Sequence, residues 1–226
     1  MMNPPDIVVN HAVTLLGAGR SFPEVVKQAL TIAPILYAAD GGANAALDMG
    51  YMPDGVIGDL DSLTPEILGQ LPADKVFRVA DQDSTDFDKC LRAIQAPLIL
   101  ATGFTGQRLD HELAAYSSLV RHPDQRCILL GEVDLCFLAP ISMRIELPVG
   151  TRFSLFPLSP CRVDATGLRW PVEALEMAPD GIIGTSNETN NTEVILRVSS
   201  RKLLGILPRK HLDAVIDALT GEENGQ

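Results

Sequence analysis

The stretch Val56–Ser62, Val-Ile-Gly-Asp-Leu-Asp-Ser, places the carboxylates of Asp59 and Asp61 directly after a short apolar run. A second acidic stretch, Asp81–Asp86, follows another apolar run and precedes a helical pattern. Such runs are typical of buried parallel strands, and ligands of open α/β sheets bind outside the carboxyl ends of the strands. Mg²⁺ takes oxygen ligands and is usually bound by one or two carboxylates plus substrate phosphates. Two acidic clusters at the ends of two strands therefore predict a metal–phosphate site.

The residues around these clusters predict a parallel sheet. From residue 12 to about residue 139, apolar runs alternate with helical patterns, which indicates repeated β-α units. Polar residues follow each expected strand at its C-terminal end. The strands are expected at residues 12–17, 35–39, 55–57, 75–79 and 98–101.

After residue 139 the period changes. Residues 141–147 and 194–198 alternate between apolar and polar side chains, as half-buried antiparallel strands do. We therefore predict an α/β protein with an N-terminal, Rossmann-like, parallel-sheet domain over residues 1–139. A small antiparallel β-sandwich or barrel is expected over 140–212, and a short helix with a polar tail over 213–226.

Composition excludes several classes of protein. The 226 residues are 46% hydrophobic and carry a formal net charge of −11. The chain is long enough to bury a core, and its charge argues against a nucleic-acid surface, which needs clustered Lys and Arg. It has no run of 18 apolar residues and no signal-peptide pattern at its start, so we expect no membrane span and a cytoplasmic location. The four cysteines form no Cys-x-x-Cys pair and are expected to be buried free thiols.

Two glycine-rich stretches have competing interpretations. Gly17–Phe22 has the beginning of a dinucleotide-binding motif, but Phe22 stands where close helix–strand packing needs glycine or alanine. Asp40 precedes two glycines, an arrangement that suits backbone amides approaching a ligand. A purely structural turn at Asp40 is the alternative.

The helix expected after the second acidic stretch carries further charges. Its apolar face contains Phe87, and we expect Asp88 to face solvent. Lys89 lies one turn from Asp86, so it forms either an ordinary helix ion pair or a phosphate contact.

Two loops offer binding groups. Arg108, Asp110 and His111 follow an expected strand and supply a cation for phosphate and polar groups for orientation, although a helix N-terminus is also typical of Asp110 and His111. Trp170 has a loop-like setting, where an aromatic ring either packs in the core or stacks on a flat or cationic ligand.

Six motifs extend over both expected domains. They are Asp40–Asn44, Gly58–Ser62, Asp81–Lys89, Arg108–His111, Gly167–Pro171 and Thr185–Glu188. In type and order they resemble the motifs of the thiamine pyrophosphokinase family, and the resemblance spans residues 12 to 207. It implies an α/β domain that binds ATP and Mg²⁺, and a β-domain that helps to hold thiamine. The implied reaction transfers a pyrophosphoryl group from ATP to the hydroxyl of thiamine, giving thiamine diphosphate and AMP.

The resemblance also implies roles for individual residues. The implied acidic catalytic set is Asp40, Asp59, Asp61 and Asp86, of which the last three are metal ligands. The residues implied to bind ATP and its phosphates are Asn44, Gln82, Thr85, Lys89, Arg108, Asp110 and His111. The implied thiamine contacts are Trp170, Ser186 and Asn187. Members of this family are homodimers with composite active sites, which is the assembly we expect.

Two other functions stay open at this stage. The first is a metal-dependent nucleotidyl- or glycosyltransferase that uses Asp59 and Asp61 to hold a nucleotide diphosphate. The second is a non-catalytic nucleotide-binding sensor.

Overall fold

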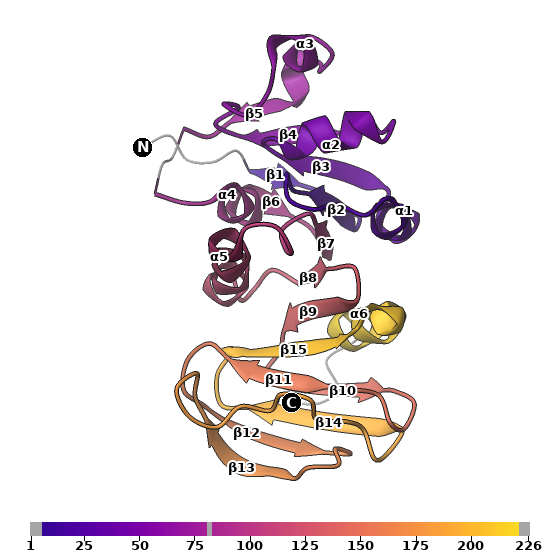
Figure 1. Ribbon diagram of the computed structural model, residues 1–226, viewed down its shortest axis with the longest axis vertical. Coiled ribbons are helices and arrows are strands. Elements are labelled where there is room, and N and C mark those ends of the chain that lie inside the picture. Colours follow the sequence, from indigo (N-terminus) through magenta and orange to yellow (C-terminus); the bar gives the residue numbers. More distant parts are fainter. Residues whose placement is uncertain (1–5, 81–82, 222–226) are drawn as a thin grey trace. The chain divides into compact units, whose positions relative to one another are not determined.

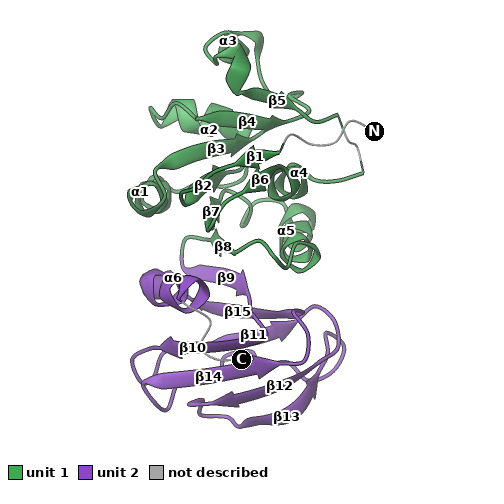
Figure 2. Cartoon of the chain, turned by 180° about the vertical axis from the view of Figure 1, so that it is seen from behind, with its two compact units in different colours: residues 1–132 green, residues 133–226 purple. Residues whose placement is uncertain are grey.

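The computed structural model describes residues 6–80 and 83–221. The chain divides into two compact units, residues 1–132 and 133–226, coloured green and purple in Figure 2. Gln82, one of the expected phosphate contacts, lies outside the described residues.

The first unit is an α/β unit built on six parallel strands (Figure 1). They are β2 (Val13–Leu16), β3 (Ile35–Ala39), β4 (Gly55–Gly58), β5 (Val76–Arg78), β7 (Ile99–Thr102) and β8 (Cys127–Leu130). Four of the six are buried along their whole length, as strands covered on both faces must be. The five strands expected from the sequence are confirmed, with ends that differ by at most one residue.

The strand order of this sheet is β8-β7-β2-β3-β4-β5. The chain proceeds from β2 to β5 in one direction and then returns to the other side of β2 for β7 and β8. The order therefore reverses between β2 and β7, which is where open α/β sheets leave a crevice for a ligand. Two short strands, β1 (Ile7–Val8) and β6 (Ile94–Gln95), form a separate parallel pair.

The helices of the first unit cover this sheet. They are α1 (Pro23–Ile32), α2 (Gly42–Asp48), α3 (Pro65–Leu68), α4 (Asp86–Ala93) and α5 (Leu109–Arg121), with a 3₁₀ turn, η1 (Ala73–Lys75). α3 begins as its Thr-Pro sequence predicts, because the Thr64 hydroxyl accepts from the Ile67 N–H (3.4 Å). In α4 the Thr85 hydroxyl accepts from the Asp88 N–H (3.3 Å). The cap fixes where α4 starts, and so where Asp86 projects.

The second unit is antiparallel. One set of strands pairs in the order β11 (Ser154–Pro157), β15 (Leu203–Pro208), β9 (Asp134–Leu138). The other forms a sheet in the order β10 (Ser142–Glu146), β14 (Glu193–Val198), β12 (Cys161–Thr166), β13 (Val172–Met177). The turn η2 (Arg209–His211) and α6 (Leu212–Thr220) follow. Burial alternates strictly along β10 and β12, as the period of the sequence predicts.

The unit boundary lies after residue 132, whereas the sequence places it after residue 139. The difference is β9, which pairs antiparallel with β15 and belongs to the second unit. β9 is a continuous apolar run, so it lacks the alternation that marks antiparallel strands in a sequence. Among the helices of residues 6–80 and 83–221, none has both the length and the apolar character that crossing a bilayer requires.

Asp88 does not face solvent, and that expectation is wrong. Its side chain is fully buried where α4 packs on α5. His122 Nε2 lies 2.8 Å from Asp88 Oδ1, and Arg121 Nη2 lies 3.0 Å from the same oxygen. Arg92 Nε, one turn along α4, lies 3.3 Å from Oδ2. A buried charge needs such partners, and the contacts with Arg121 and His122 fasten α4 to the end of α5.

We predict that Asp88→Asn lowers the free energy of unfolding by about 2–3 kcal/mol. This is below the usual cost of breaking a buried ion pair, because Arg121 is half-exposed and keeps its hydration. The measurement is urea unfolding followed by circular dichroism. Asp74→Asn, at an exposed residue of η1, is the control and should change stability by less than about 0.5 kcal/mol. Equal midpoints for the two variants would contradict the assignment.

Candidate active site

A cavity of about 290 Å³ lies at the carboxyl ends of the strands of the first unit, where the strand order reverses. Glycines allow the loops after β2 and β7 to meet beside it. The Gly19 N–H donates to the Gly103 carbonyl oxygen (2.8 Å), and a Cβ at Gly17 would lie 2.5 Å from that oxygen. The Gly17–Gly19 stretch thus has a packing role, consistent with the absence of a full dinucleotide motif.

Three carboxylates gather beside this cavity. One oxygen from each of Asp40, Asp59 and Asp61 lies within 4.8 Å of the others. Asp40 and Leu60 have φ of 44° and 69°, a region that non-glycine residues occupy only where their surroundings enforce it. Gly58 permits the approach, since a Cβ there would lie 2.7 Å from the Cβ of Asp40.

The carboxylate of Asp40 is buried but not fully satisfied. Asp40 is 3% exposed, and its Oδ1 has no hydrogen-bond partner among the described residues. The nearby Asn44 is similar, because its Nδ2 donates to the Ser62 carbonyl oxygen (3.0 Å) while its buried Oδ1 accepts nothing described. A buried oxygen without a partner is unfavourable, and a cation or a donor from a ligand removes that cost. Three clustered carboxylates with a spare buried oxygen fit a divalent cation.

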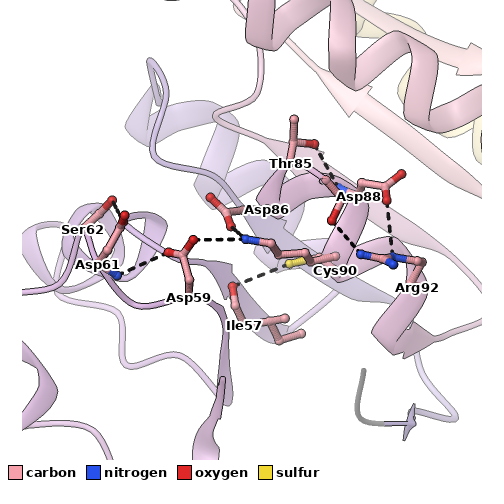
Figure 3. A network of polar contacts seen from close by, with 11 residues as sticks. Ile57, Asp59, Asp61, Ser62, Thr85, Asp86, Asp88, Cys90 and Arg92 are labelled. Carbon is pink, nitrogen blue, oxygen red and sulfur yellow. Dashed lines mark hydrogen bonds and ion pairs between the residues drawn. The ribbon is translucent and has the colours of Figure 1, made fainter. Parts of the chain in front are cut away.

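Lys89 connects this cluster to the second acidic stretch. The side chain is 3% exposed, and its Nζ lies 2.9 Å from Asp86 Oδ1 and 3.3 Å from Asp59 Oδ2. Figure 3 shows the carboxylates of Asp59 and Asp86 turned toward the same point from the loop after β4 and from α4. Lys89 was expected to form either a helix ion pair or a phosphate contact. The structure contains the ion pair with Asp86, and the phosphate contact stays a prediction.

Burial and these contacts set the charges of the three groups. Burial lowers the pKa of Lys89, but its bonds to Asp86 and Asp59 outweigh this and raise that pKa. Burial raises the pKa of Asp59, yet the Asp61 N–H and the charge of Lys89 outweigh it, so the pKa is lowered. For Asp86 burial prevails over Lys89, and the charges of Asp40 and Asp59 add to it, so the pKa of this carboxyl is raised. Lys89 and Asp59 are thus stabilised in their charged forms.

Three of the other predicted phosphate contacts line the cavity, whereas Asn44 and Asp110 are not among its lining residues. Thr85, Arg108 and His111 line it, and Asp86 does too. Arg108 is held by two bonds to Asp110, Nε to Oδ1 (3.2 Å) and Nη2 to Oδ2 (2.6 Å), and both side chains are exposed.

The sequence did not identify the aromatic residues that line this cavity. Phe87 and Phe104 line the cavity with their ring centroids 4.5 Å apart. The position of Phe104 between Gly103 and Gly106 could have indicated it, since an aromatic residue in a glycine-rich loop after a strand often faces a ligand. Phe87 carried no such signal, because its helical period is that of a core residue.

The predicted thiamine contacts come together in the second unit. Trp170 is 51% exposed in a loop, and Ser186 is exposed with φ of 61°. Asn187 is buried and fastens the tryptophan: its Oδ1 accepts from the Trp170 N–H (3.2 Å) and its Nδ2 donates to the Trp170 carbonyl oxygen (2.9 Å). Trp170 is therefore not a core residue.

The four cysteines are buried and unbridged, as expected.

Comparison with known proteins gives consistent results. The family model for the thiamin pyrophosphokinase catalytic domain matches residues 26–129, and that for the thiamin pyrophosphokinase vitamin B1 binding domain matches residues 142–204. Thiamine pyrophosphokinase 1 of Arabidopsis thaliana is 30% identical over 230 residues, which cover 87% of this chain and 86% of the relative. Thiamine pyrophosphokinase 1 of Oryza sativa subsp. japonica is 30% identical over 218 residues, covering 81% and 83%.

Solved structures with a similar fold include the thiamin pyrophosphokinase from Candida albicans. Its TM-score is 0.73 at 18% identity, over 92% of this chain and 94% of that one. Yeast thiamin pyrophosphokinase gives a TM-score of 0.70 at 17% identity, over 94% and 93%. At these identities the likeness establishes the α/β fold with its separate antiparallel sheet.

Lys89→Met should produce a stability deficit that depends on pH. Without Lys89, only influences that raise the pKa of Asp86 remain, so its folded pKa rises further above the unfolded value. Such a group favours the folded state at low pH and loses that contribution as pH increases. Asp59 at the same time loses its interaction with Lys89, which helps to lower the pKa of Asp59. The charged Asp59 carboxylate therefore stabilises the folded state less at pH values above its unfolded pKa. The two effects have the same sign.

We expect a deficit of about 3 kcal/mol near pH 7.5 that narrows to less than about 1 kcal/mol near pH 4. Urea unfolding in the presence of a chelator measures it, because a metal ion would replace the missing charge. Lys27→Met, at an exposed residue of α1, serves as the control. A deficit of the same size at both pH values would mean that Lys89 stabilises by packing and not by charge.

Proposed function

The chain belongs to the thiamin pyrophosphokinase family, and we propose that it transfers a pyrophosphoryl group from ATP to the hydroxyl of thiamine. The products are thiamine diphosphate and AMP. The observation that carries this proposal is the cavity at the reversal of strand order, with a partly unsatisfied buried carboxylate beside two others. The match of the chain to both family models supports the same reaction and does not favour a nucleotidyl- or glycosyltransferase or a nucleotide sensor.

We propose Mg²⁺ as the metal. Asp59 and Asp61 would hold it, as the sequence predicts, with Asp40 as the third carboxylate because of its spare buried oxygen. Asp86, the third ligand implied by the resemblance, borders the same cavity and bonds to Lys89, and its role as a metal ligand stays a prediction. When bound, the ion would neutralise and align phosphate oxygens.

The phosphates of ATP would lie in the cavity, between the carboxylates and the loop after β7. Arg108 supplies a cation there, and Asp110 holds the plane of its guanidinium by two bonds. Thr85 and His111 add polar groups to the wall. The further proposed ATP contacts are Asn44, Gln82 and Lys89. These groups bind and orient the phosphates, which is most of what phosphoryl-transfer catalysis requires.

Thiamine would lie against Trp170 and Ser186. The thiazolium is a cation, and the face of an indole attracts cations. Asn187, the third residue proposed for thiamine, has three hydrogen bonds within the protein, so its contribution includes holding Trp170 in place.

The proposal also covers the assembly, the description of the fold and the cellular location. We propose a homodimer whose composite active sites combine the α/β domain of one chain with the β-domain of its partner. We describe the first unit as Rossmann-like and the second as a small β-sandwich or barrel. The cytoplasmic location stays a prediction from the sequence.

Analysis of the products tests the reaction. Purified protein with ATP, thiamine and Mg²⁺ should form AMP and thiamine diphosphate in equal amounts. ADP with thiamine monophosphate would contradict transfer of a pyrophosphoryl group. ATP binding without turnover would indicate a sensor.

Asp59→Asn should lower kcat at least about 100-fold, because metal binding and positioning supply most of the barrier reduction in such a site. The fold should survive, since Lys89 keeps its closer partner, Asp86. Asp48→Asn, at an exposed residue of α2, is the control and should keep wild-type kcat. Near-normal turnover of Asp59→Asn at saturating Mg²⁺ would remove Asp59 from the site.

Trp170→Ala should weaken thiamine binding by about 1–3 kcal/mol and leave the KM for ATP nearly unchanged. Trp170→Phe keeps an aromatic face and should lose less. If the alanine variant instead loses ATP affinity, Trp170 does not contact the acceptor.

The composite site can be tested with two variants that are both impaired when thiamine is well below its KM. In a mixed dimer of Asp59→Asn and Trp170→Ala, one site carries both changes and the other carries neither. An equal mixture gives half mixed dimers, so co-refolding should restore about a quarter of wild-type activity. If differently tagged chains exchange and activity stays at the mean of the two parents, each site belongs to a single chain.

A further inference from the structure

Trp170 lies in a loop that the protein holds rigidly. We call residues Gly167–Pro171 the indole loop. Gly167 has φ of 81°, and a Cβ there would lie 2.0 Å from the Glu193 carbonyl oxygen, so the loop begins pressed against β14. The Arg169 N–H donates to the Glu188 carbonyl oxygen (2.8 Å), and Asn187 bonds both the N–H and the carbonyl of Trp170. The ring therefore stands on a fixed backbone.

One face of that ring is already covered. The guanidinium carbon of Arg169 lies 5.0 Å from the centre of the Trp170 ring. The same guanidinium is paired with Glu188, Nη1 to Oε1 at 2.7 Å. Trp170 is nevertheless 51% exposed, so the remainder of the indole is open to a ligand.

The ion pair between Arg169 and Glu188 contributes little to the stability of the fold. The side chains of Arg169 and Glu188 are 60% and 35% exposed, and ion pairs this accessible contribute little to folding. The backbone of Glu188 makes its bonds whatever its side chain is, through its N–H to Asn187 and its carbonyl to Arg169. The contribution specific to the Glu188 carboxylate is to neutralise the charge of Arg169 beside the indole ring.

We propose that Glu188 is a specificity-determining residue for a cationic acceptor, acting through Arg169 and Trp170. Arg169 occupies one face of the indole, so the cation stacks on the open part. An unpaired guanidinium beside the same ring would repel that cation, and the carboxylate of Glu188 removes the repulsion. This inference rests on the proposed function, because it takes the thiazolium of thiamine as the cation.

The chain contains a single tryptophan, so its tryptophan fluorescence reports on Trp170 alone. Thiamine is titrated into wild type and Glu188→Gln, with fluorescence as the readout, at about 20 mM and about 500 mM KCl. Glu193→Gln is the matched control, since Glu193 also pairs with an exposed arginine, Arg144, in the same unit. The double variant Arg169→Gln with Glu188→Gln restores a pair without net charge.

At low salt the Kd of Glu188→Gln for thiamine should be about fivefold above wild type, and at high salt the difference should fall below about twofold, since salt screens exposed charges. Glu193→Gln should match wild type at both salt concentrations. The double variant should bind thiamine within about twofold of wild type at low salt. The KM for ATP should not change in any of them.

Three results would overturn the inference while leaving the proposed function intact. The first is wild-type affinity in Glu188→Gln at low salt. The second is a defect in Glu188→Gln that persists at high salt and in the double variant, which would assign it to lost contacts. The third is conversion of thiamine by wild type without a response of Trp170 fluorescence. If wild type neither binds nor converts thiamine, the proposed function itself fails.

Discussion

The ammonium group of Lys89 lies between two carboxylates, 2.9 Å from Asp86 and 3.3 Å from Asp59, and the acidic end of the sheet depends on it. Without a cation there, Asp59 and Asp86 would face each other and Asp40 across a partly buried space, and repulsion would separate them. Lys89 itself is placed by α4, in which the preceding residue, Asp88, is bound to the end of α5. One helix therefore organises the charges of the site on one side and is anchored on the other.

The cavity beside these charges depends on close approaches that only glycine permits. The loops after β2 and β7 touch through Gly17, Gly19 and Gly103, and Gly58 brings the end of β4 against Asp40. Because the strand order reverses at the same place, the loops diverge just beyond these contacts and leave room for a ligand. The fold thus supplies both the negative groups and the space that a phosphate-bearing substrate with a metal ion requires.

Much of this arrangement could be predicted from the sequence, and the failures have a common physical cause. The parallel strands, and the position of Asp59 at the end of one of them, were predictable because apolar runs that end in polar residues are a local pattern. The burial of Asp88 was not, because its partners Arg121 and His122 lie more than 30 residues further along the chain. β9 was assigned to the first unit for a similar reason, since only its pairing with β15 identifies it as antiparallel. Local sequence shows which elements form, and distant partners decide which polar groups can be buried.

We propose that Asp40, Asp59 and Asp61 form a metal site beside a Lys89–Asp86 pair that stays intact. Mn²⁺ takes the same oxygen ligands as Mg²⁺ and gives an anomalous X-ray signal, so crystals soaked in Mn²⁺ test this directly. We expect an anomalous peak within bonding distance of these three carboxylates, with Lys89 still in contact with Asp86. A peak elsewhere, or no peak at a Mn²⁺ concentration that supports full activity, would contradict it.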